Sequence, residues 1–156
     1  MEAALRSAYY LVNKKNPDLN AFKNVRGLDE YKEATFDFDN GVEVKVAVVH
    51  SLSNVRKLIN RILNKEVTYD FVEVMACAGG CINGGVQIID LDGGDFAARS
   101  NILYSLDKAN NIRFSHENPW VIAYYKDYLQ EPLSEKTHHF FHRYHIKEMN
   151  EAKNKK

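Results

Sequence analysis

The chain has few cysteines and no formal net charge, and each of these features argues against a class of protein. Only two cysteines occur in 156 residues, so a disulfide framework is disfavoured and a reducing, cytoplasmic environment is expected. The 21 basic residues are balanced by 21 acidic ones, giving a formal net charge of +0 and no indication of nucleic acid or an anionic membrane as partner. No apolar run approaches the length of a membrane span, and we expect no signal peptide before Leu5. We therefore expect a single globular domain.

Glycine is sparse overall but concentrated in one stretch, residues 70–87, which reads DFVEVMACAGGCINGGVQ. Residues 71–75 are apolar or β-branched without a breaker, which predicts a buried strand. The strand runs into Cys77 and Cys81, with glycines at positions 79, 80, 84 and 85. Glycines let backbone amides approach a bound object, and thiolates select soft metals and iron–sulfur clusters. The spacing of the two cysteines alone fits a ligand pair and a structural turn equally well.

The rest of the chain predicts an α/β fold. Helices are expected at residues 1–13, after Ser51 or Ser53, at about 95–109, after Asn118 and after Ser134, and strands at 33–38, 42–50 and 71–75. Asn40-Gly41 is a hairpin turn signal. The predicted fold is a small mixed sheet with a parallel β-α-β core flanked by helices. Such units bind ligands beyond the carboxyl ends of their strands, where Cys77 lies.

Several side chains outside the cysteine stretch have both a structural and a functional interpretation. The helix after Ser51 is expected to carry one apolar stripe, which comprises Val55, Leu58, Ile59, Ile62 and Leu63. Trp120, Tyr124 and Tyr128 recur at helical spacing, and a core position is favoured over a cofactor site. His50 ends an apolar strand and is expected to be a core histidine with its hydrogen bonds satisfied. Glu73 is either an oriented acceptor beside a bound group or a paired structural carboxylate.

The last predicted helix carries three histidines at metal-chelating spacing. They are His138, His142 and His145, and their i, i+4, i+7 spacing could hold zinc or nickel. Phe140 and Phe141 lie among them, and no cysteine or acidic ligand is adjacent, so docking is favoured over coordination. Residues 147–156 are expected to form a charged tail that frays.

The run from Glu73 to Gln87 resembles the third cysteine motif of the iron-only (FeFe) hydrogenases, which reads roughly E-x-M-A-C-P-x-G-C-x-x-G-G-G-Q-P. The cysteine spacing is kept. The chain departs from the motif at Ala78 and Ile88, where the family has proline, and at Val86, where it has glycine. Valine resists left-handed backbone conformations, so either Val86 is extended, which we favour, or the loop takes a different path.

Further segments resemble the same family in the same order. They are EAALR at 2–6, VRGL at 25–28, VAVVH at 46–50, RKLI at 56–59, SHENP at 115–119 and EPLS at 131–134. The resemblance covers roughly residues 1–145 and corresponds to the C-terminal part of the family's catalytic domain. It implies that residues 1–146 form one lobe of a two-lobed hydrogenase fold, followed by the tail at 147–156.

The resemblance implies roles for the motif residues. Cys77 would ligate a 4Fe-4S cubane, Cys81 would bridge the cubane to a two-iron centre, and Met75 would line the two-iron pocket; Gly79, Gly80, Gly84 and Gly85 would border this H-cluster. The whole family reaction is reversible proton reduction to hydrogen under anaerobic conditions, with an electron partner such as ferredoxin.

A cubane needs four protein thiolates, and the chain has two. In the family, the other two ligands, a proton-relay cysteine and a pocket lysine belong to motifs that this chain lacks. We therefore expect the chain alone to be inactive and to need a chain or segment carrying the missing motifs, or to self-associate through an apolar patch beside Cys77 and Met75. Two alternatives remain open: a non-catalytic iron–sulfur binding or assembly protein, and an interaction domain without a cluster.

Overall fold

The computed structural model describes residues 1–39, 41–88 and 95–142, in two units that divide after Phe114. Each unit is described by itself. Three features of the sequence interpretation lie outside the described residues: Asn40 of the hairpin turn, His145, and the charged tail at 147–156.

The first unit is the predicted α/β fold. Its elements are α1 (Glu2–Asn13), η1 (Lys23–Val25), β1 (Tyr31–Asp37), β2 (Glu43–His50), α2 (Leu52–Leu63), β3 (Phe71–Met75), η2 (Gly80–Asn83) and α3 (Phe96–Ala109). The sheet has the order β1-β2-β3, with β1 antiparallel and β3 parallel to β2. The expected hairpin and the expected β-α-β unit are both confirmed. Strand β3 has the predicted bounds, but the prediction that it is buried is wrong, because Phe71 and Val74 are exposed.

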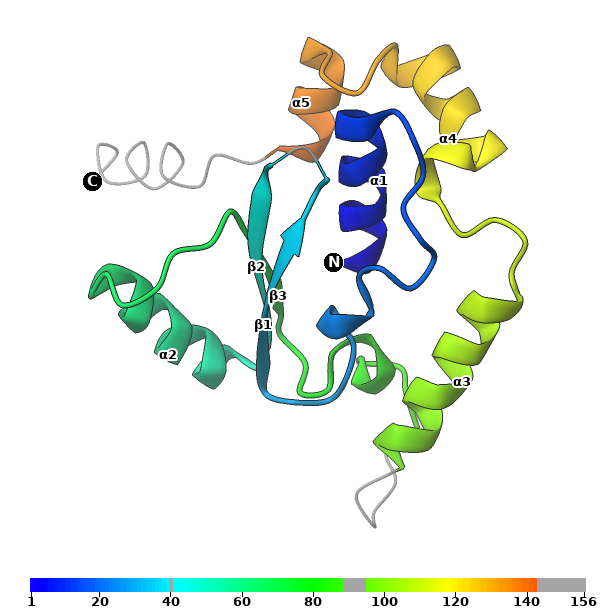
Figure 1. Cartoon of the computed structure of the whole chain (residues 1–156). Helices are drawn as coiled ribbons and strands as arrows, with labels where there is room; N and C mark the ends of the chain where they lie inside the picture. The colour runs from blue at the N-terminus through cyan, green and yellow to red at the C-terminus, as the bar shows by residue number, and fades with distance from the viewer. Residues whose placement is uncertain (40, 89–94, 143–156) are drawn as a thin grey trace, which may run out of the picture. The chain divides into compact units, whose positions relative to one another are not determined.

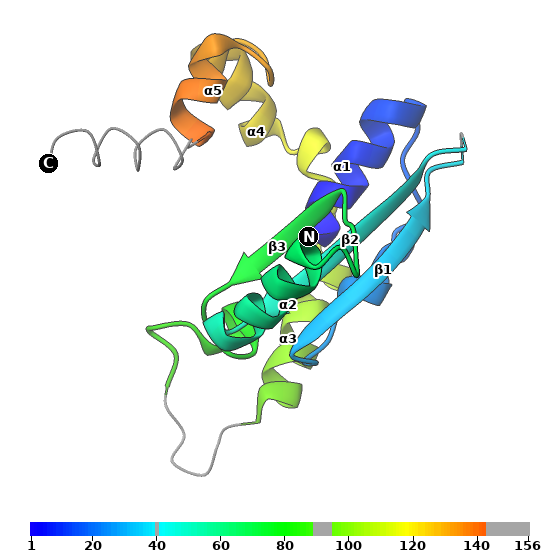
Figure 2. The same cartoon turned by 90° about the vertical axis from the view of Figure 1, so that its left-hand side faces the viewer.

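Helices cover both faces of this sheet. Figures 1 and 2 show α1 and α3 on one side of the strands and α2 on the other. A strand that is buried on both faces is expected to be continuously apolar, and β2 is apolar from Val46 to Val49. Val46 and Val48 pack towards α1, whereas Ala47 and Val49 pack with Leu58 of α2. Strand β2 is therefore held by packing on both of its faces, and this fixes the place of its carboxyl end.

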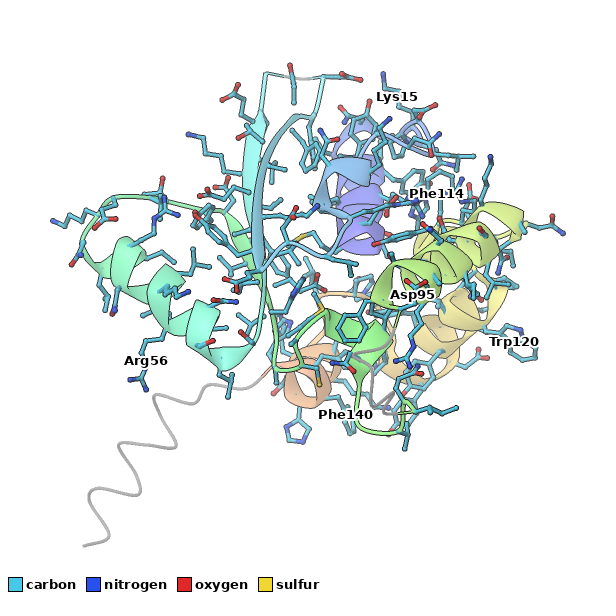
Figure 3. The ribbon with its side chains drawn as sticks, turned by 90° about the horizontal axis from the view of Figure 1, so that it is seen from below. Lys15, Arg56, Asp95, Phe114, Trp120 and Phe140 are labelled. Carbon is cyan, nitrogen blue, oxygen red and sulfur yellow. The ribbon has the colours of Figure 1, made fainter. Side chains whose placement is uncertain are left out.

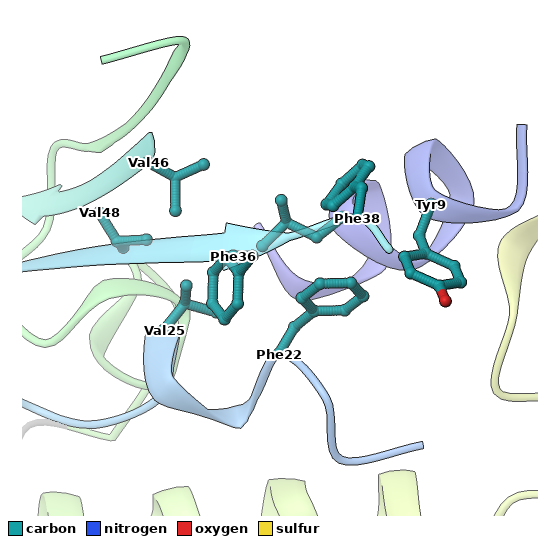
Figure 4. Packing of buried hydrophobic residues seen from close by; sticks show 8 residues of the cluster. Tyr9, Phe22, Val25, Phe36, Phe38, Val46 and Val48 are labelled. Carbon is teal, nitrogen blue, oxygen red and sulfur yellow. The ribbon is translucent and has the colours of Figure 1, made fainter. Parts of the chain in front are cut away.

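Aromatic rings fill the core on the α1 side. Phe22 lies edge-on to Phe36, with 5.0 Å between ring centroids, and Tyr9 lies edge-on to Phe38 at 5.5 Å (Figure 4). Edge-to-face pairs at this separation add about 0.5–1.5 kcal/mol beyond the area they bury. This core holds α1 against the sheet, next to the end of β3.

The apolar stripe of α2 is only partly buried. Leu58 is buried, but Ile59, Ile62 and Leu63 are exposed. Neither predicted capping mode is found either, because the Ser51 side chain makes no cap hydrogen bond and pairs with Ser53 Oγ at 3.1 Å. Within the stripe, Leu58 and Val55 pack with the core residues of β2 on this side of the sheet.

The second unit is helical and begins at Ser115. It contains η3 (Ser115–Glu117), α4 (Pro119–Tyr124), a π-helical turn η4 (Tyr125–Leu129) and α5 (Glu135–Phe141). The two predicted caps are confirmed: Asn118 accepts from the amide of Trp120, and Ser134 accepts from the amide of Thr137. The π turn was not predicted, since no residue pattern marks it.

The aromatic stripe of Trp120, Tyr124 and Tyr128, on α4 and η4, is a correction to the sequence prediction. Tyr124 and Tyr128 stack at 5.4 Å between centroids, as their spacing predicts. The predicted core position is wrong, however: Trp120 is 82 % exposed and points away from the ribbon (Figure 3), and both tyrosines are also exposed.

Among the described residues, no helix has both the length and the apolar character that a membrane span requires.

Candidate functional site

Two left-handed glycines shape the loop that carries the cysteines. After β3 the chain turns at Cys77, whose carbonyl accepts a 3.0 Å hydrogen bond from the Gly80 amide. Gly79 and Gly80 have φ angles of +77° and +70°. A residue with a Cβ is strained in this region, so both glycines are required by the backbone and not only by a ligand. The turn leads directly into η2, whose second residue is Cys81.

The second of these glycines also makes a close approach to Met75. A Cβ built on Gly80 would lie 2.8 Å from Met75 Sδ and 3.2 Å from its Cε. At Gly79 the same construction meets only ordinary contacts of 3.7 Å or more. The loop therefore packs on the Met75 side chain, and this packing brings together two residues that the motif singled out.

Two side chains hold the rest of the loop in place. Asn83 Nδ2 donates to the carbonyl of Ala78 at 3.1 Å. Arg99 of α3 donates to the carbonyl of Ile82 at 3.4 Å and to that of Ile88 at 2.8 Å. Arg99 was missed from the sequence, because nothing in the pattern of α3 shows that one arginine reaches back to the loop.

The second glycine pair behaves differently from the first. Gly84 and Gly85 do not have positive φ angles, and a Cβ on either would meet nothing closer than 3.9 Å. Gln87 N–H donates to the Gly84 carbonyl at 3.0 Å, so Val86 is the third residue of a turn. The favoured extended position for Val86 is therefore wrong. The valine is nevertheless accommodated without left-handed strain, and its side chain is fully exposed.

Both thiols are reachable from solvent. Cys77 and Cys81 are free and exposed, although they follow a strand of the sheet. A pocket of about 230 Å³ lies beside them, and it is lined by Met75, Gly79, Gly80 and Cys81 among others. Of the predicted site residues, Cys77, Gly84 and Gly85 do not line it. The structure thus gathers four of the seven predicted site residues around one cavity, and Cys77 is not one of the four.

Paired charges form much of the remaining wall of the pocket. Glu73 Oε1 lies 2.8 Å from the terminal amino group of Met1, so Glu73 is a paired carboxylate in this structure. Glu2 and Arg26 also line the pocket and contact each other at 2.5 Å. The Arg26 guanidinium lies 4.5 Å from the centroid of the Tyr104 ring. The hydrogen bond from Arg26 to Glu2 is the main reason that the pKa of Arg26 is raised.

A partly buried ionic network continues from Glu2 and Arg26 of this wall and joins α1, the residue after η1, and α3. Arg6 is only 4 % exposed and contacts Glu2 at 2.7 Å and Asp107 at 3.5 Å. Asp107 also accepts from Arg26 at 3.1 Å and from Arg113 at 2.6 Å. Burial alone would raise the pKa of Asp107, but the hydrogen bonds from Arg113 and Arg6 outweigh it and lower that pKa. The network was not predicted, because buried arginines look like surface residues in a sequence.

The donor set fits part of a cluster site. Thiolates are the ligands that iron–sulfur clusters take, and a cubane takes four of them. The chain has two cysteines in all, both exposed on a loop with required glycines. In the described part of the chain, no group of three or more His, Cys, Asp or Glu side chains is arranged to hold a metal ion. The residues present therefore fit one half of a cubane ligand set.

The histidines of α5 form a pair instead of a described triad. His138 Nδ1 and His142 Nδ1 lie 2.5 Å apart, and the ring centroids are 4.5 Å apart. His145 lies outside the described residues. The pair stands at the end of a helix in the second unit and shares no described residue with the pocket in the first.

A mixed β-α-β sheet with a glycine-shaped loop carrying two thiols after its edge strand defines the class of α/β domain, and comparison with known proteins assigns the family. The family described as "Iron only hydrogenase large subunit, C-terminal domain" matches residues 1–85, and "Iron hydrogenase small subunit" matches residues 96–148. The chain belongs to the iron-only hydrogenase family.

Individual relatives include hydrogenases and assembly factors. The NADP-reducing hydrogenase subunit HndD of Solidesulfovibrio fructosivorans is 39% identical over 150 residues, which is 94% of this chain and 25% of HndD. A probable cytosolic Fe-S cluster assembly factor of Drosophila willistoni is 33% identical over 136 residues, 85% of this chain and 28% of the factor. The chain spans about a quarter of the length of these relatives.

A solved structure gives the same picture. FeFe-hydrogenase HydA1 from Chlamydomonas reinhardtii is similar with a TM-score of 0.70 at 34% identity, over 88% of this chain and 42% of that one. The predicted α/β hydrogenase-type fold is thereby confirmed.

Proposed function

We propose that this chain is the cluster-ligating C-terminal lobe of an iron-only hydrogenase catalytic domain and that Cys77 and Cys81 supply half of the thiolates of its cubane. The observation that carries the proposal is the pair of exposed, free thiols on a loop that two left-handed glycines shape beside a pocket. Family membership and the kept cysteine spacing support it. When bound in a complete site, the cluster supplies the electrons and the iron centre for reversible proton reduction to hydrogen.

The chain's own residues have positioning roles in this proposal. Gly79 and Gly80 turn the backbone so that two thiols four positions apart follow one strand end. Met75 packs on Gly80 and lines the pocket with Cys81, so it supports the part of the loop that carries the second thiol. Arg99 and Asn83 hold the loop in one conformation by bonding its carbonyls. Together they form a pre-organised half-site, to which the remaining ligands have to be brought.

A second polypeptide or segment supplies those ligands in this proposal. Strand β3 pairs only with β2 in the described sheet, and Phe71 and Val74 on it are half exposed. Val86 and Ile88 add exposed apolar surface to the loop that follows. An apolar edge of this kind is normally covered by a partner. The partner that fits is a segment carrying the missing cysteine motifs. Association of two copies of this chain is the other arrangement that would bring four thiols together.

A second function is favoured by a specific observation. Relatives named as cytosolic iron–sulfur assembly factors match over most of the chain, and positions 78, 86 and 88 depart from the hydrogenase motif. The alternative is a non-catalytic iron–sulfur protein that uses the same two thiols. Infrared spectroscopy separates the two, because only a two-iron hydrogenase centre carries CO and CN ligands. An interaction domain without a cluster would bind no iron in either case.

The test is reconstitution of the full chain with iron and sulfide, alone and together with the part of HydA1 that precedes the matching region. We expect the chain alone neither to evolve nor to consume hydrogen and the mixture to retain iron and sulfide. Cys77→Ser and Cys81→Ser should each lose the retained iron while keeping the fold by circular dichroism. Ala78→Ser is the matched control, since it changes the same loop and keeps both thiols. Iron retention that is equal in all four proteins would overturn the proposal.

A further inference from the structure

One side chain of the pocket is buried and unpartnered. His50 ends β2 and lies opposite Met75 in the parallel ladder. Its backbone is fully engaged, because its amide donates to the Glu30 carbonyl at 3.1 Å and its carbonyl accepts from Asn54 at 3.0 Å. Its ring, by contrast, has no hydrogen bond or ion pair among the described residues, although the residue is only 6 % exposed. Burial of His50 was predicted, but a satisfied ring was not found.

The open nitrogens of this ring face accessible space. Fully enclosed side-chain nitrogens without a partner in the described residues are Arg6 Nε and Arg113 Nε. The unpartnered nitrogens of His50 are not among them, so they keep some contact with open space. The pocket that His50 lines is also lined by Cys81 and Met75. Buried polar groups are normally hydrogen-bonded, and this ring is therefore placed to meet something that occupies the pocket.

The other charged groups of the wall are already committed. Glu73 is paired with the amino terminus, and Glu2 and Arg26 are paired with each other. Ser100 and Tyr104 of α3 are the other wall side chains that have a polar oxygen and no hydrogen bond in the described residues. A hydroxyl and an imidazole can both donate to an acceptor, but only His50 stands in register with Met75 at the strand end that leads to the cysteines.

We infer that His50 is a positioning residue that donates a ring N–H hydrogen bond to the sulfur of the group held at Cys81, either the thiolate itself or an adjacent cluster sulfide. The inference rests on the proposed function, since it needs a cluster at the two cysteines. Hydrogen bonds to cluster sulfurs favour the more negative, reduced state and so raise the reduction potential. His50 would therefore set the potential of the bound cluster without ligating iron.

The experiment compares wild type, His50→Gln and His50→Leu in the reconstituted mixture of the full chain with the HydA1 segment. Glutamine keeps N–H donors, and leucine fills similar space without any. We expect equal iron retention in all three, a lower midpoint potential in His50→Leu by redox-titrated electron paramagnetic resonance, and a potential in His50→Gln close to wild type. In wild type carrying ¹⁵N-histidine, pulsed electron paramagnetic resonance should detect coupling between the reduced cluster and a ring nitrogen, and His50→Gln should lose it.

The outcomes distinguish a failure of the inference about His50 from a failure of the proposed function. If wild type retains no cluster, the proposed function fails and the inference fails with it. If wild type retains a cluster but shows no ¹⁵N coupling, only the inference is overturned, and this holds even where His50→Leu does not fold. An unchanged potential in a folded His50→Leu protein overturns it equally.

Discussion

The contact between Gly80 and Met75 allows the loop geometry to be tested by a series of glycine-to-alanine substitutions. Gly80→Ala combines two costs, a left-handed φ of +70° and a Cβ at 2.8 Å from Met75 Sδ. Gly79→Ala has the left-handed cost alone, because its Cβ would meet only ordinary contacts. Gly85→Ala has neither cost, since its φ is not left-handed and nothing lies within 4 Å.

The magnitudes follow from these differences. The left-handed conformation costs an alanine about 1–2 kcal/mol, and the stiffer unfolded chain returns about 0.4–1 kcal/mol. Gly79→Ala should therefore lose about 1 kcal/mol. Gly80→Ala should lose about 1 kcal/mol more, which is the cost of forcing Met75 off its rotamer. Gly85→Ala should change stability by less than about 0.5 kcal/mol or be slightly stabilising.

The assay is urea unfolding of the full chain, with the free energy of unfolding compared at constant slope. Gly41→Ala is a control far along the chain, since its φ is +79° and a Cβ there meets nothing within 4 Å. It should behave like Gly79→Ala. The excess cost of Gly80→Ala should also disappear in a Met75→Ala background, because the clashing sulfur is then gone. Equal losses for Gly79→Ala and Gly80→Ala, or an excess that survives Met75→Ala, would refute the packing argument.

Three further predictions concern strain and ionisation elsewhere in the first unit. Ser51 has φ 67° and ψ 142°, a strained region for serine that costs about 1–3 kcal/mol, so Ser51→Gly should raise the melting temperature by roughly 2–4 °C after the entropy cost of glycine. Arg113 and Arg6 lower the pKa of Asp107 despite its partial burial. The stability that the ionised Asp107 contributes is therefore complete above its ordinary pKa and is lost as pH falls through the pKa of the folded state. Asp107→Asn should be less stable at neutral pH, and its free energy of unfolding, measured with urea, should fall less steeply as the pH is lowered. Burial and then the hydrogen bond to Glu33 raise the pKa of Tyr69 to about 12. The stability that the protonated Tyr69 contributes is complete below pH 10.0 and is lost as pH rises through 12. Tyr69→Phe should remove the phase at highest pH from an ultraviolet titration of the phenol groups.

The sequence predicts the strands, the hairpin and two helix caps well because their signals are local. The run of apolar residues and its short length identify both β2 and the segment 71–75 as strands. The Asn40-Gly41 dipeptide marks the hairpin turn. Asn118 and Ser134 cap helices through contacts within three residues. Each of these features is decided by neighbours in the chain, and each is confirmed.

The features that escaped prediction depend on distant neighbours. The α2 stripe has a helical period, but its burial depends on how much of the sheet face reaches it. Arg6 and Asp107 are 101 positions apart, and nothing local shows that they meet in a buried network. The missing ring partner of His50 is likewise visible only once the surrounding wall is known. The cysteine motif itself was found from its residues, whereas the role of Met75 against Gly80 needed the structure.

Mapping of thiol protection tests the central claim most directly. The full chain, alone and then reconstituted with iron and sulfide in the presence of the HydA1 segment, is treated with an alkylating reagent, and the modification of each cysteine is followed by mass spectrometry. Both thiols are exposed and free, so both should react quickly in the chain alone and both should be protected together in the reconstituted mixture. Thiols that resist alkylation until the chain is denatured, or protection of one cysteine without the other, would contradict the claim that Cys77 and Cys81 ligate one cluster.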